Sequence, residues 1–377
     1  MTEDWLEGSY STRLMTDWGE GAPSQYDRGM TDVTEADGIV TMDISSKDKE
    51  NRRAFYTNFT EQALAKTSGD DDEGKSTDDK NLIYVAHEQV LAWRAWVDVR
   101  YRVPGASARL FCCPWAGGNS LAFADWPDRL PGVEVVPLLL PGRLMRASES
   151  PISDLNEIVN AAVEALCGLH LLTREDEDIP CFIFGHEFGA IVAFEICRRV
   201  QAEFHMKALF VSGMSCPQMV HEREKLSLLC QVSDHGEILH SKNTEASYPL
   251  RPGMSSAFFE SAILRRGLPL PLELGENKDL LEIFMPLWLA DLSAVDTYEY
   301  KGGPLLECPI YSFGGENDSE HNMTNWAMES TSKQGSSTRF PGGGFFLCHR
   351  ENQDEMLQLI SDRCVNKREA GDYPRNT

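Results

Sequence analysis

Short apolar runs recur along the chain from about residue 108 onward. Five of them hold mainly Val, Leu, Ile, Phe and Cys and carry few charges. Runs of this length and composition are typical of buried strands in a parallel sheet. The predicted strands are 108–113, 133–140, 181–184, 208–212 and 309–313.

Amphipathic stretches lie between and after these runs. Residues 154–172 place apolar side chains at the 3.6-residue spacing of a helix, and residues 190–200 form a second helical stretch directly after a predicted strand. Residues 351–364 close this pattern as a further helix. Alternation of strands and helices with short connections predicts an α/β fold, with a mainly parallel sheet flanked by helices.

The first 85 residues differ from the rest of the chain. They hold 19 acidic and nine basic residues, and residues 67–79 are almost entirely polar. Such a segment buries too little apolar surface to offset its ordering entropy, so we expect residues 1–85 to be an acidic, disordered extension with a short helix at 52–66. The alternative is a tail that docks a basic partner.

Overall composition excludes several classes of function. The 377 residues include 59 acidic and 35 basic ones, a formal charge of −24, which opposes binding to nucleic acid. The chain has no apolar run long enough for a membrane span, and its start has no secretion signal. The ten cysteines lack zinc-ligand spacing. We therefore expect a cytoplasmic protein with no metal and no cofactor.

The most informative segment is 184–189, Phe-Gly-His-Glu-Phe-Gly, between a predicted strand and a predicted helix. The pattern G-x-S-x-G in this setting is a nucleophile elbow, in which glycines permit a tight turn that exposes the middle residue. Both glycines are present here, but the middle residue is Glu187. His186, just before it, is expected to be a hydrogen-bonded core residue.

The segments around this elbow carry a resemblance to a known family. In the right order, the chain resembles type II thioesterases, α/β-hydrolases that remove acyl groups from carrier proteins. The motifs are residues 109–118, 140–143 with Arg146, 184–194, 268–271, 313–318 and 340–347. The resemblance implies an α/β-hydrolase domain at 95–365 with a helical lid at about 215–292.

The resemblance also implies the positions of the site residues. The nucleophile position is Glu187, the acid position is Asp318, and the base position is Gly344, where the family has histidine. The oxyanion-hole positions are Ala116 and Phe188, and Arg143 and Arg146 are candidates for contact with a carrier protein or substrate, with loop support as the alternative. The implied partner is an acyl carrier protein or acyl-CoA.

The loss of serine and histidine leaves the chemistry open, because a serine nucleophile needs its base. Glu187 could act as a carboxylate nucleophile, with His349 as a replacement base. It could instead fold back onto the oxyanion-hole amides, or it could point into solvent with no role. Three functions follow: a catalytically degenerate protein that binds or regulates acyl species, an active acyl thioesterase that uses Glu187, or a structural subunit that keeps only the fold.

Overall fold

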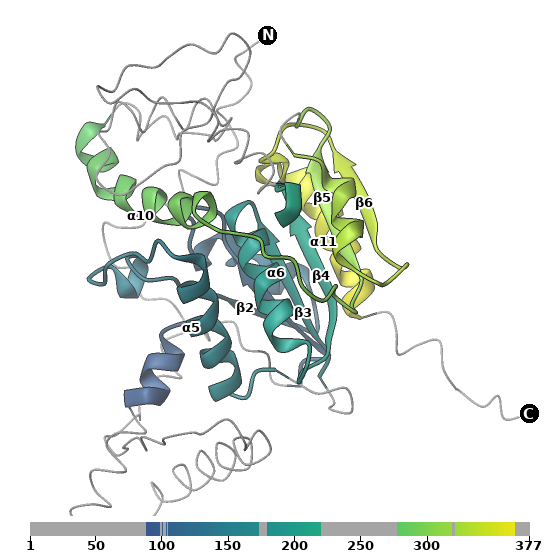
Figure 1. Ribbon diagram of the computed structural model, residues 1–377, viewed down its shortest axis with the longest axis horizontal. Helices are drawn as coiled ribbons and strands as arrows, with labels where there is room; N and C mark the ends of the chain where they lie inside the picture. The colour runs from purple at the N-terminus through teal and green to yellow at the C-terminus, as the bar shows by residue number, and fades with distance from the viewer. Residues whose placement is uncertain are drawn as a thin grey trace, which may run out of the picture.

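The computed structural model describes residues 88–365, except 99, 101–102, 104, 173–178, 220–276 and 319–320. The predicted extension at 1–85, its short helix and most of the predicted lid therefore lie outside the described residues. Within them, a twisted sheet stands between layers of helices (Figure 1).

The sheet has six strands in the order β2-β1-β3-β4-β5-β6, and every neighbouring pair is parallel. The strands are β1 Ala108–Cys113, β2 Val133–Pro137, β3 Cys181–His186, β4 Met206–Ser212, β5 Ile310–Gly315 and β6 Ser336–Phe340. The predicted α/β class and the α/β-hydrolase fold are confirmed.

Helices cover both faces of this sheet because its strands are apolar on both sides. In β1, Leu110 and Cys112 pack into one core, and Phe111 and Cys113 pack into the other. This alternation follows the two-residue period of a strand. The second core lies under α5 (Leu155–Gly168), α6 (Phe188–Val200) and α10 (Lys278–Asp296), whereas the first lies under α4 (Trp126–Arg129) and α11 (Arg350–Cys364) (Figure 1).

Short 3-10 helices join these elements. They are η2 Ser120–Phe123, η3 Leu144–Arg146, η4 Met323–Glu329 and η5 Phe346–Cys348. Two buried charges interrupt the apolar strands β1 and β2, and they form a pair: Arg109 in β1 lies opposite Glu134 in β2, with Nε 2.6 Å from Oε2. Pairing compensates for the loss of water around both buried groups.

The strands and helices match the sequence pattern closely where burial is complete. The run 108–113 is β1 to the residue, and the helix predicted at 351–364 is α11, which begins one residue earlier. The pattern did not predict β6, because its residues are polar and mostly exposed at the edge of the sheet. No helix among the described residues is long and apolar enough to cross a membrane.

Candidate active site

The carboxyl ends of the parallel strands meet at one edge of the sheet. In such folds, ligand sites form at this edge from the loops that follow the strands. The loop after β1 holds Ala116, the turn after β3 holds Glu187, the loop after β5 holds Asp318, and the loop after β6 holds Gly344. The topology thus brings together segments that are more than 200 residues apart in the chain.

The turn at Glu187 has the strained geometry of a nucleophile elbow. Glu187 has φ 51° and ψ −122°, a conformation that residues with side chains rarely adopt. A Cβ at Gly185 would overlap the Gly189 carbonyl oxygen, and a Cβ at Gly189 would overlap the Cys113 carbonyl oxygen. Both glycines are therefore required for the close packing of β3, α6 and the end of β1.

The side chain of Glu187 is buried, with a relative exposure of 5%, and it points toward the loop after β1. Its Oε2 accepts a hydrogen bond from the backbone N–H of Ala116 at 2.9 Å. Glu187 also stands at the N-cap of α6, where the helix dipole favours a negative charge. The two donors expected for an oxyanion hole are the backbone amides of Ala116 and Phe188. In the structure, the Ala116 amide donates a hydrogen bond to the Glu187 carboxylate.

Asp318 lies beside Gly344, and its carboxylate has another partner. A Cβ built at Gly344 would lie 3.2 Å from Asp318 Oδ2, which makes the two positions neighbours in space. His321 lies three residues after Asp318, and its Nδ1 is 3.0 Å from the same oxygen. The His321 N–H also donates to Asp318 Oδ1 at 3.1 Å. The Asp318 carboxylate therefore orients an imidazole, but this is the imidazole of His321 in the same loop rather than of a residue at position 344.

His186 is fully buried behind the elbow. Its Nδ1 lies 3.0 Å from the Ser212 hydroxyl, and the rings of Trp115 and Phe345 meet it edge-on. Burial lowers its pKa to about 3, with a further lowering by the charge of nearby His321, partly opposed by Asp318. His186 is thus a neutral imidazole near pH 7. This is the hydrogen-bonded core position that the sequence indicated for it.

Both arginines near the site are directed toward internal acceptors. Arg143 is 5% exposed and forms a two-pronged ion pair with Asp291 of α10, at 2.8 Å for each N–O contact. Arg146 pairs with Glu149, donates to the Leu139 carbonyl and lies over the Trp96 ring at 4.6 Å. Contact of Arg143 or Arg146 with a carrier protein stays a prediction.

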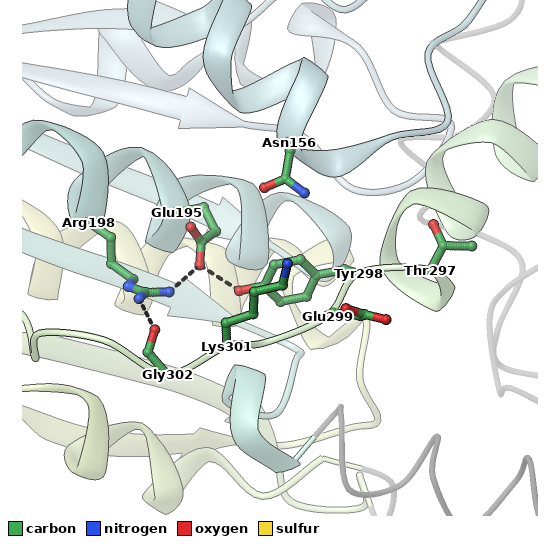
Figure 2. Close-up of a pocket in the computed structure, with 8 residues that line it drawn as sticks. All are labelled: Asn156, Glu195, Arg198, Thr297, Tyr298, Glu299, Lys301 and Gly302. Carbon is green, nitrogen blue, oxygen red and sulfur yellow. Dashed lines mark hydrogen bonds and ion pairs between the residues drawn. The ribbon is translucent and has the colours of Figure 1, made fainter.

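A polar cavity of about 290 Å³ lies elsewhere, beside the C-terminal half of α6 and the segment after α10 (Figure 2). Glu195 at its centre accepts hydrogen bonds from Arg198 at 2.7 Å and from the Tyr298 hydroxyl at 2.5 Å. Arg198 also donates to the Gly302 carbonyl. Glu195 follows Glu187 by more than two helical turns, so this cavity is separate from the elbow. Four of its lining residues, Glu195, Arg198, Tyr298 and Gly302, are joined by these hydrogen bonds.

A parallel sheet with helices on both faces and a strained strand-turn-helix elbow at its carboxyl edge define an α/β-hydrolase. The particular branch of this class comes from comparison with known proteins. The family model for the thioesterase domain matches residues 108–364, and the chain belongs to this family. The resemblance stated from the sequence motifs is therefore confirmed.

Individual relatives include proteins of gramicidin S biosynthesis, of fatty acid synthase and of the prodiginine pathway. The gramicidin S biosynthesis protein GrsT of Aneurinibacillus migulanus is 30% identical over 68% of this chain and 88% of its own length. The human medium-chain S-acyl fatty acid synthase thioesterase is 28% identical over 69% of this chain and 88% of its own. The solved structure of RedJ, a thioesterase of the prodiginine pathway in Streptomyces coelicolor, is 27% identical and has a TM-score of 0.53, covering 68% of this chain and 86% of that one.

Two residues near the site were not found from the sequence. The spacing Asp-x-x-His at 318–321 is the signal that could have indicated His321 as a partner for Asp318. The resemblance to the family indicates residue 344 as the histidine position instead. Asp291 lies within the stretch 215–292, for which the resemblance implies only a lid. His349, the alternative base, is exposed at the N-cap of α11. Among the described residues, no cluster of ligating side chains could hold a metal ion.

Proposed function

We propose that this protein binds acyl thioesters, carried on a carrier protein or on CoA, without hydrolysing them. The observation that carries this proposal is the hydrogen bond from Ala116 N–H to the Glu187 carboxylate. In a thioesterase, a donor at this position stabilises the negative charge that develops on the substrate carbonyl oxygen. In this protein, the Glu187 carboxylate accepts the hydrogen bond from that donor.

Two further features support binding without turnover. Residue 344 has no side chain to act as a base, and residue 187 has no hydroxyl to activate. In other hydrolases, loss of triad members lowers the rate by factors of about 10⁴ to 10⁶. The substrate class rests on the relatives, which include thioesterases of fatty acid synthase and of a natural-product pathway.

The contact between Asp318 and His321 favours a second candidate function, hydrolysis with Glu187 as nucleophile. The Glu187 carboxylate would attack the thioester carbon, the C–S bond would break, and the leaving thiolate would take a proton from the His321 imidazolium. This step gives a mixed anhydride. Neutral His321 would then take a proton from water, whose oxygen attacks the acyl carbon, releasing the acid and restoring the Glu187 carboxylate.

One pair of measurements separates the two functions. The full-length protein is titrated with octanoyl-CoA and with an octanoyl carrier protein by calorimetry, and thiol release is followed in parallel. We expect binding with no release of thiol above the uncatalysed background. Thiol release that disappears in both Glu187→Ala and His321→Ala would establish hydrolysis instead, and its loss in His349→Ala rather than in His321→Ala would identify His349 as the base. Absence of any binding would contradict both functions and leave the structural-subunit alternative.

A further inference from the structure

Arg143 and Asp291 form a buried ion pair behind the turn at residues 115–118, which we call the oxyanion loop. Asp291, 1% exposed on α10, accepts from the two terminal nitrogens of Arg143 at 2.8 Å each. Its Oδ2 also accepts from the Gly117 N–H at 2.7 Å, and Arg143 Nη1 donates to the Gly118 carbonyl at 2.9 Å. One ion pair therefore holds both an amide donor and a carbonyl acceptor of the loop.

A tryptophan from the same helix packs on this loop. Trp288 lies one turn before Asp291, and a Cβ at Gly117 would overlap its indole ring. Gly117 has φ +73° at the third position of a turn closed by a hydrogen bond from Gly118 N–H to the Trp115 carbonyl at 2.8 Å. A positive φ at this position is the mark of a type II turn and favours glycine. Helix α10 thus contacts the loop through a ring and through a carboxylate.

These contacts determine the direction of the Ala116 N–H. The Ala116 N–H and the Trp115 carbonyl belong to one planar peptide group, so the hydrogen bond that this carbonyl accepts from the Gly118 N–H orients the Ala116 N–H. Asp291 holds the Gly117 N–H and Arg143 holds the Gly118 carbonyl, which keeps the turn in this conformation. With the turn held in this way, the Ala116 N–H faces Glu187 and donates to its carboxylate. The amide of Ala116 therefore donates to the Glu187 carboxylate, and the next amide, that of Gly117, donates to the Asp291 carboxylate.

We propose that Asp291 is a positioning residue that, through Arg143 and Gly117, aims the Ala116 N–H at residue 187. Asp291 acts through the loop, and its carboxylate accepts hydrogen bonds from Arg143 and Gly117. Because α10 carries Asp291, the helix that ends the predicted lid also sets the direction of the hydrogen-bond donor in the site. This inference goes beyond the proposed function and applies equally to binding and to hydrolysis.

The test follows the Ala116 amide in the full-length protein labelled with ¹⁵N-alanine. Its resonance is assigned by its absence in Ala116→Gly, and its hydrogen-bonded state is calibrated against Glu187→Ala, which removes the acceptor. In Asp291→Asn, Glu187 is unchanged, yet we expect the Ala116 amide to lose its hydrogen-bonded shift and to exchange about tenfold faster with solvent. The double variant Arg143→Gln/Asp291→Asn, which leaves no unpaired buried charge, is expected to do the same.

A matched control is Glu134→Gln, which breaks the equally buried ion pair between Arg109 and Glu134. This variant is expected to lower stability but to leave the Ala116 shift unchanged. The inference is overturned if the Asp291 variants fold and keep the native shift and exchange rate of Ala116, or if Glu134→Gln alters both equally. Failure of both Asp291 variants to fold would also overturn it, because the pair would then be a condition of folding rather than a local positioning device.

Discussion

Gly344 lies against Asp318, because a Cβ built on this glycine would be 3.2 Å from the Asp318 Oδ2 atom. The φ of Gly344 lies outside the range +20° to +160°, so its backbone conformation accepts a side chain. Within 4 Å, that Cβ would meet only the Asp318 carboxyl group, which is the group that an imidazole at this position needs.

The first prediction is that Glu187→Ser and Gly344→His together create hydrolysis. A serine at 187 needs a base, and a histidine at 344 would receive its orienting contact from Asp318. We expect the double variant to hydrolyse a short activated acyl ester at least about tenfold faster than either single variant, since residues that act as a unit are not additive. The measurement is a steady-state ester assay on all three proteins.

His321 makes this assay more informative. If Glu187→Ser alone matches the double variant, and this activity is lost in Glu187→Ser/His321→Ala, then His321 already serves as the base. If all variants fold and none exceeds the native protein, residues 187, 318 and 344 do not form a working constellation.

A second prediction concerns pH and His186. Its pKa is about 3 in the folded protein against 6.5 as the ordinary value. Below pH 6.5 the unfolded chain takes up a proton that folded His186 does not, so the stability contribution of neutral His186 is complete above this pH and declines toward pH 3. Between pH 7 and pH 5, this amounts to about 2 kcal/mol.

The measurement for His186 is urea denaturation at pH 7 and pH 5. The native protein should lose about 2 kcal/mol more than His186→Asn over this interval, because asparagine does not titrate. An identical loss in the two proteins would show that His186 titrates normally.

A third prediction uses the crowding at the elbow. A Cβ at Gly189 would overlap backbone carbonyls of Cys113 and Pro114, whereas a Cβ at Gly343 meets no atom within 4 Å. Gly189→Ala should therefore lower the free energy of unfolding by about 3 kcal/mol or more, because the carbonyls cannot move aside as a side chain can. Gly343→Ala should change it by less than about 0.5 kcal/mol. Thermal or urea unfolding of both variants decides the point, and equal effects would contradict the described packing.

Local sequence patterns predicted the fold well because burial on both faces of a parallel sheet makes its strands almost wholly apolar. The elbow was predictable because its two glycines and the residue between them form a local pattern, although the contact that requires Gly189 comes from Cys113 at the end of β1. By contrast, β6 was missed because an exposed edge strand carries no apolar period. The pairing of Asp291 with Gly117 joins residues 174 positions apart, and it depends on how α10 docks, which no local pattern encodes.

The left-handed backbone at Glu187 has a consequence for how this sequence changes over time. A non-glycine residue in such a conformation costs on the order of 1–3 kcal/mol, and glycine would relieve most of that strain. Glutamate and glycine codons differ by a single nucleotide, so the relaxed turn is always one mutation away. If the carboxylate had no use, selection for stability would favour glycine at this position. Comparing sequences of this protein from closely related populations would therefore show whether glutamate is retained at position 187 in spite of the strain.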